Sequence, residues 1–169
     1  MLSIEYRGVG GAILTQYSAL NTSQTAMLPG GKFFIPNNVH IMGTMNTIDR
    51  SVESFDLALR RRFRWERIDP EIEVLRYHLN SNGLNQWSGL ADNLNSLNKC
   101  IRGEDILGAD YEIGHAYLMN LRYPSALSLS EVRKSVWRDS IKPLLEEYVR
   151  GSEHSKELMP KFQNAFGVQ

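Results

Sequence analysis

Several features that narrow the function of a protein are scarce or missing in this chain of 169 residues. The single cysteine, Cys100, excludes an internal disulfide, which fits a reducing compartment. No apolar run reaches the roughly 18 residues of a membrane helix, and the first residues, MLSIEYRGVGG, lack the apolar core of a signal peptide. We therefore expect a cytoplasmic protein with no membrane partner.

An excess of charge of either sign is also missing. Lys+Arg and Asp+Glu both number 19, so the whole chain has no strong field that would attract nucleic acid or an anionic membrane. Locally the picture differs, because six arginines fall between positions 50 and 67: Arg50, Arg60, Arg61, Arg62, Arg64 and Arg67. The informative feature is therefore this local cluster of positive charge.

Two sequence patterns, one for phosphate binding and one for metal binding, are absent from the sequence. No G-x-x-x-x-G-K-[ST] phosphate-binding loop occurs anywhere in the chain. The four histidines, at positions 40, 78, 115 and 154, lack metal-ligand spacing, so no metal site is predicted. The lone Cys100 adjoins an apolar helical stripe, which favours a core position over a nucleophile.

What is present is a globular composition, with 42% hydrophobic and 22% charged residues, sufficient for one domain or two small ones. The informative stretch begins at Val39–Met45, a short apolar run typical of a strand buried on both faces of a parallel sheet. Asn46 then follows at the carboxyl end, where ligands of open α/β sheets lie. Its amide could contact a phosphate and orient a water, or it could simply cap a turn.

A helix is expected next, with Ser51 as its N-cap and the arginines at 60–62 near its end. Successive helical residues point about 100° apart, so these three arginines cannot all serve one site. One is expected to pair internally while one or two reach outward. The alternatives are a solvated basic helix end, or a nucleic-acid contact with Phe63 and Trp65 as neighbouring aromatics.

The second half of the chain is predicted to be mostly helical. After a possible short strand at Trp65–Ile68, Asp69 and Pro70 form a helix start, and Asn82-Gly83 a stop. The further helices expected are Trp87–Ile101 closed by Gly103, a long helix opened by Ser130 and restarted at Pro143, and a weaker one at Glu153–Phe166.

Four segments together resemble the AAA+ core of the McrB family, the motor subunit of methylation-dependent restriction systems. They are GTMNTIDRS (43–51), FDLALRRRF (55–63), YEIGHAYL (111–118) and IKPLLEEY (141–148), in the order the family has them. The resemblance implies an α/β fold class: the second half of an AAA+ α/β subdomain at 1–69 and an α-helical lid at 70–169.

The resemblance also implies roles for individual residues. Asn46 matches the sensor-1 position, which contacts the γ-phosphate and the attacking water. Asp49 lies in the M-N-T-x-D signature considered for guanine selectivity. Arg61 matches the arginine finger, which acts on nucleotide held by the adjacent subunit, and Arg62 a second family arginine. His115 falls in the lid, near where AAA+ proteins read nucleotide state, although a helix-start histidine hydrogen-bonded within the lid is the interpretation that its residue type and position favour.

The implied assembly is a homohexameric ring that hydrolyses GTP or ATP with Mg²⁺. It would power DNA translocation and cleavage by a McrC-like nuclease, with DNA read by a domain outside this chain. The family's phosphate-binding loop and Asp-Glu motif do not occur in this sequence, so we expect a fragment that is inactive alone. The alternative is a non-catalytic module that binds nucleic acid or protein.

Overall fold

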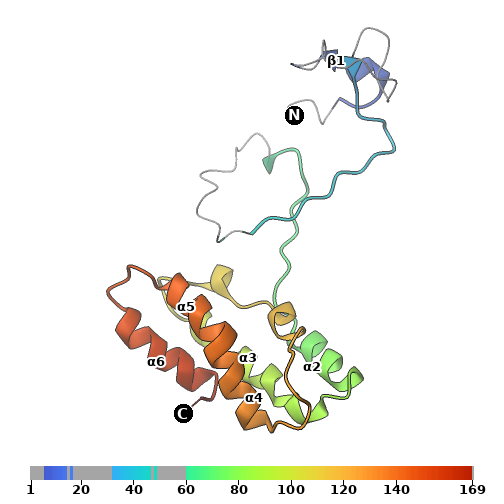
Figure 1. Cartoon of the computed structure of the whole chain (residues 1–169). Coiled ribbons are helices and arrows are strands. Elements are labelled where there is room, and N and C mark those ends of the chain that lie inside the picture. The colour runs from blue at the N-terminus through green and yellow to red at the C-terminus, as the bar shows by residue number, and fades with distance from the viewer. Residues whose placement is uncertain (1–5, 15, 17–31, 47, 49–59, 169) are drawn as a thin grey trace. The chain divides into compact units, whose positions relative to one another are not determined.

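The computed structural model describes residues 6–14, 16, 32–46, 48 and 60–168. By its internal contacts the chain divides into two compact units, residues 1–66 and 67–169. In Figure 1 the labelled helices, α2 to α6, all belong to the second unit. Each unit is described by itself below.

The first unit holds a two-stranded antiparallel sheet. Strands β1 (Ile13–Leu14) and β2 (Lys32–Phe33) pair with Ile13 opposite Phe33 and Leu14 opposite Lys32. A short 3-10 turn at Val9–Gly11 precedes β1. At Gly8 the backbone takes a φ of 77°, which glycine adopts without strain, and its N–H donates to the Ile35 carbonyl at 2.7 Å.

The prediction of a buried strand at Val39–Met45 is wrong for this structure. These residues form no strand, and Met42 is 95% exposed. A strand buried on both faces needs a partner on each edge and a layer above and below it. Among the described residues the only sheet is the antiparallel pair β1–β2, so the expected parallel sheet is not found there.

The helix expected after Ser51 lies outside the described residues, except for its last turn at Arg60. The strand expected at Trp65–Ile68 is also wrong, since these residues are irregular. The Trp65 indole instead turns back, and its Nε1–H donates to the Arg60 carbonyl at 3.0 Å.

The second unit is a helical domain, as the sequence predicted. Helix α2 (Ile72–Ser81) ends at Asn82, and α3 (Gly89–Arg102) ends at Gly103, as expected from the stop signals. The start of α2 comes later than predicted, with Glu71 as N-cap. Asp69 lies two residues before this N-cap, and its carboxylate accepts a bond from the Arg67 guanidinium at 2.5 Å.

The next two helices meet at a widened turn. Helix α4 (Leu129–Val136) is followed by a π-helical turn at Trp137–Ile141 and then by α5 (Lys142–Tyr148). Pro143 lies in the first turn of α5, where its missing N–H cannot bond to the carbonyl four residues earlier. The π turn accommodates this break, which confirms the predicted restart at Pro143.

The start of α4 differs from the prediction, since Ser128 caps the helix rather than Ser130. The Ser128 hydroxyl accepts from the Glu131 N–H at 3.4 Å, and the Ser128 N–H donates to the Glu131 carboxylate at 2.8 Å. This reciprocal arrangement is a capping box. Ser130 lies inside the helix, where it cannot serve as a cap.

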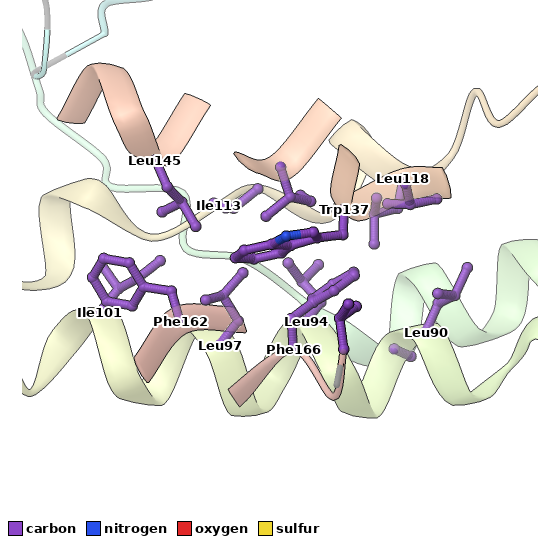
Figure 2. Close-up of a cluster of buried hydrophobic side chains, with 14 of the residues drawn as sticks. Leu90, Leu94, Leu97, Ile101, Ile113, Leu118, Trp137, Leu145, Phe162 and Phe166 are labelled. Carbon is purple, nitrogen blue, oxygen red and sulfur yellow. The ribbon is translucent and has the colours of Figure 1, made fainter. Parts of the chain in front are cut away.

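One apolar core ties the helices together (Figure 2). Helix α3 contributes a fully buried stripe, and the Trp137 ring stacks on Phe166 with centroids 5.8 Å apart. Helix α6 (Ser155–Ala165) adds Leu158 and Phe162, so the weak final helix of the sequence is well packed. The α3 stripe consists of Leu90, Leu94, Leu97 and Ile101.

Candidate functional site

Asn46 occupies an exposed turn in the first unit. Its side-chain Oδ1 accepts a hydrogen bond from the Ile48 N–H at 3.2 Å. This is the local turn contact that the sequence left open as an alternative. The bond uses only the oxygen of the amide, so the Nδ2 group is left as the donor that could meet an anionic oxygen.

The three consecutive arginines have different surroundings. The Arg60 guanidinium lies 5.5 Å from the centroid of the Trp65 ring, a cation–π contact that occupies this side chain locally. Arg61 is exposed, whereas Arg62 is half-buried. Arg61 therefore has the environment expected of an arginine that reaches outward.

Of the other two predicted site residues, His115 belongs to the described part of the chain and Asp49 does not. Asp49 lies outside the described residues. His115 opens a 3-10 turn at His115–Leu118 in the second unit and is half-buried. Its Nδ1 accepts a hydrogen bond from the Glu71 backbone N–H at 2.9 Å, which gives α2 its N-terminal partner.

A buried asparagine that the sequence analysis did not single out holds the residues just before His115. Asn98 lies on α3 and is 5% exposed. Its Nδ2 donates to the Ile113 carbonyl at 2.9 Å, and its Oδ1 accepts from the Ile113 N–H at 2.8 Å. Both polar ends of the side chain are thus satisfied by the backbone of one residue.

Ion pairs secure the same segment. The Arg102 guanidinium bonds both carboxylate oxygens of Glu112, whose side chain is only 4% exposed, and this hydrogen bonding raises the pKa of Arg102. Arg67 bonds Asp110 at 2.6 Å and the Ala109 carbonyl at 2.9 Å. Arg67 therefore bonds to residues of the helical domain, unlike Arg60, whose guanidinium lies against Trp65.

One sequence signal could have identified Asn98. It lies four residues after Leu94 and beside Leu97, on the apolar face of an otherwise regular amphipathic helix. A polar residue in such a stripe must find partners when it is buried. Those partners, at Ile113, could not be deduced from spacing, because they come from an irregular segment after the helix.

The three described candidate residues share one chemical property. Asn46, Arg61 and His115 can each donate hydrogen bonds to oxygen atoms. Within the described part of the chain, no three His, Cys, Asp or Glu side chains gather closely enough to hold a metal ion. None of the helices described there combines the length and apolar composition needed to cross a bilayer.

Comparison with known proteins places these observations in a family. Residues 89–156 match the model of the McrB alpha-helical lid domain. The chain is 39% identical over 126 residues to the type IV methyl-directed restriction enzyme EcoKMcrB subunit of Escherichia coli strain K12. The alignment covers 69% of this chain and 27% of that relative, so the chain spans about a quarter of the relative's length. The chain is thus McrB-like, and residues 89–156 of its helical domain are similar to the alpha-helical lid of McrB.

Proposed function

We propose that this chain is part of a ring-forming, McrB-like AAA+ NTPase that works in a restriction system. The observation that carries the proposal is the 39% identity to an McrB subunit across most of the chain, together with the lid match at 89–156. On this proposal residues 1–69 belong to the α/β subdomain and residues 70–169 to the lid. The motifs around Asn46, Arg61 and His115 then occur where the motor needs them.

Asn46 is proposed to sense the terminal phosphate of the nucleotide bound by its own subunit. Its Oδ1 is engaged by the Ile48 N–H, so its Nδ2 group can donate to a phosphate oxygen. An amide does this without adding negative charge next to the phosphates. In the same position it would orient the water that attacks the phosphorus. Asp49, three residues later, is proposed to contribute to the choice of base.

Arg61 is proposed to act on nucleotide bound by the neighbouring subunit. Its exposure in the first unit is compatible with such a role in trans, and Arg62 would support it. A guanidinium placed there neutralises charge that develops on the transferred phosphoryl group. In well-studied enzymes the effect is worth about 10³ to 10⁵ in rate. Such a finger requires a closed ring of identical subunits, for which we propose a hexamer.

The nucleotide is GTP by the McrB resemblance, with ATP as the alternative, and Mg²⁺ would accompany it. The sequence has no phosphate-binding loop, so the 169 residues alone are proposed not to hydrolyse nucleotide. The partners proposed are identical subunits, a McrC-like nuclease subunit, and DNA held by a separate domain.

A second candidate function is a non-catalytic module that binds nucleic acid. The supporting observation is the run Arg60–Trp65, in which Arg60, Arg61 and Arg64 are exposed and Arg60 makes a cation–π contact with the Trp65 ring. Guanidinium groups beside aromatic rings are a common feature of single-strand binding surfaces. This candidate predicts salt-sensitive DNA binding by the chain without any dependence on nucleotide.

The test uses rings of a protein that joins this chain to a phosphate-binding loop. Asn46→Ala should abolish most turnover while nucleotide binding stays within a few-fold, because the phosphates keep their other ligands. The matched control is Asn37→Ala, another exposed turn asparagine in the same unit. Equal turnover in the Asn46→Ala protein and the wild type would contradict the sensor role, and turnover by the 169-residue chain alone would contradict its proposed inactivity.

A further inference from the structure

The segment from Glu112 to Met119 has no regular structure beyond the 3-10 turn at His115–Leu118, yet helices α2 and α3 hold it at both ends. At one end Asn98 of α3 bonds the backbone of Ile113, and at the other the His78 ring of α2 bonds the Met119 carbonyl through Nε2 at 2.9 Å. Fixing irregular backbone costs conformational entropy, which these contacts offset. The residues between the two ends are therefore presented in a defined position.

Ile113 is the point at which this segment is most firmly fixed. Its side chain lies in the apolar core, as Figure 2 shows, and is 2% exposed, while Asn98 bonds both its N–H and its carbonyl. A buried asparagine without partners would be strongly destabilising, so the two groups depend on each other. Ile113 in turn fixes where the chain continues to His115.

The His115 ring has a defined protonation pattern because of its single bond. A nitrogen that accepts a hydrogen bond carries no proton, so the bond from Glu71 N–H to Nδ1 places the proton of the neutral ring on Nε2. Among the described residues none accepts a bond from this Nε2. The Nε2–H group is therefore an unused donor.

The chain on either side of the half-buried His115 is accessible. Gly114 and Ala116 flank His115 and are both exposed. A Cβ built on Gly114 would meet no atom within 4 Å, and its φ of −62° and ψ of 143° suit any residue. Neither internal packing nor backbone strain thus requires glycine there. A ligand atom could approach the backbone and the Nε2–H group together.

We propose that Asn98 is a positioning residue for His115, holding it as the Nε2–H tautomer that donates to an acceptor oxygen or nitrogen of the nucleotide. The identity of the ligand rests on the proposed function, whereas the positioning of His115 by Asn98 does not. Asn98 acts through Ile113, which sets the backbone so that Nδ1 meets the Glu71 N–H. A neutral donor of this kind recognises an acceptor atom without adding charge.

The positioning is tested on the 169-residue chain by ¹⁵N NMR of the histidine side chains, assigned with His115→Gln. The wild type should show a protonated Nε2 and an unprotonated Nδ1 at His115. Asn98→Leu should release the ring, so that both nitrogens give averaged shifts. Asn98→Asp, which keeps the acceptor for Ile113 N–H and loses the donor, serves if the leucine variant does not fold.

The matched control is Val132→Ala, which opens a cavity in the same core but lies on α4, outside the segment and its hydrogen bonds. It should lower stability and leave the His115 tautomer unchanged. An Nδ1–H tautomer in the wild type would overturn the inference. So would an unchanged tautomer in the Asn98 variants, or an equal release in Val132→Ala.

The ligand is tested in rings that also carry the phosphate-binding loop, with fluorescent GTP and ATP analogues as probes. His115→Phe and Asn98→Leu should each weaken nucleotide binding about 3- to 10-fold, the value of one neutral hydrogen bond. His115→Gln, which keeps a side-chain N–H, should stay within about twofold. Unchanged binding in His115→Phe, with the tautomer confirmed, would overturn the nucleotide contact alone. Failure of the proposed function would appear separately, as turnover that survives Asn46→Ala.

Discussion

At the scale of single residues, the surroundings of a side chain decide its chemistry more than its type does. Cys100 is half-buried beside the apolar core, and this burial, together with the nearby Glu104 carboxylate, raises the pKa of its thiol. The reactive form of cysteine is the thiolate, which becomes scarcer at neutral pH as the pKa rises. Cys100 is therefore expected to be an inert core residue, as its sequence context indicated.

This expectation can be measured by alkylation with iodoacetamide. At pH 8 the folded chain should react much more slowly than the same chain in urea, and the folded rate should climb as the pH is raised toward the thiol pKa. Mass spectrometry follows the reaction cleanly because the chain has one cysteine. A folded rate equal to the unfolded rate would contradict the burial of this thiol.

Residue-scale prediction from sequence succeeded where local chemistry was sufficient. The stop of α3 at Gly103 and the restart at Pro143 follow from backbone properties of those residues themselves. The role of Asn98 did not follow, since its partners belong to Ile113, fifteen positions along the chain. Contacts of this kind depend on tertiary packing that spacing does not encode.

At the scale of elements, helix α4 shows how one signal can be assigned to the wrong residue. The sequence SLSE offers two serines as caps, and both are exposed in the structure. Only Ser128 has a glutamate three positions later, which completes the capping box with Glu131. The capping-box spacing would have selected Ser128 over Ser130.

Two substitutions test which of the two serines caps helix α4. Ser128→Ala should lower the free energy of unfolding by about 1 kcal/mol, because the Glu131 N–H loses its acceptor. Ser130→Ala, an exposed change inside the same helix, should leave it nearly unchanged or raise it slightly, since alanine favours helices. Urea denaturation followed by circular dichroism compares the two. Equal losses in both variants would show that Ser128 is not the cap.

The largest element-scale error concerns Val39–Met45. Its apolar composition predicted a buried strand, but burial needs neighbouring strands, and the described residues supply none beside it. Composition reports what a segment would do inside a sheet, not whether the sheet is present. The proposed sensor role of Asn46 therefore rests on its motif and its free amide nitrogen rather than on a strand end.

At the scale of the whole molecule, the helical domain contains the entire set of buried apolar side chains among the described residues. These run from Leu75 to Val168, all within the unit at residues 67–169. Burial of apolar surface is the dominant favourable term in folding. The helical unit is thus expected to fold by itself.

Deletion of residues 1–66 tests this expectation. The remaining chain should unfold cooperatively, with a Tm within a few degrees of the 169-residue chain, because it keeps every buried apolar side chain of the described residues. Differential scanning calorimetry gives both values. A shortened chain that fails to unfold cooperatively would show that the helical unit depends on the residues before it.

The central claim is that this chain supplies one half of a shared catalytic site, with Arg61 acting on the nucleotide of a neighbour. The most direct measurement mixes two inactive proteins, each joining this chain to a phosphate-binding loop: one with Arg61→Ala and one with the loop lysine replaced. Rings that contain both variants have interfaces at which an intact Arg61 meets an intact phosphate-binding loop. Mixing should therefore restore nucleotide hydrolysis. Arg64→Ala, an exposed arginine of the same cluster, is the control that should stay active alone. If both single variants are inactive and their mixture also shows no turnover, the assignment of Arg61 as a finger in trans is contradicted.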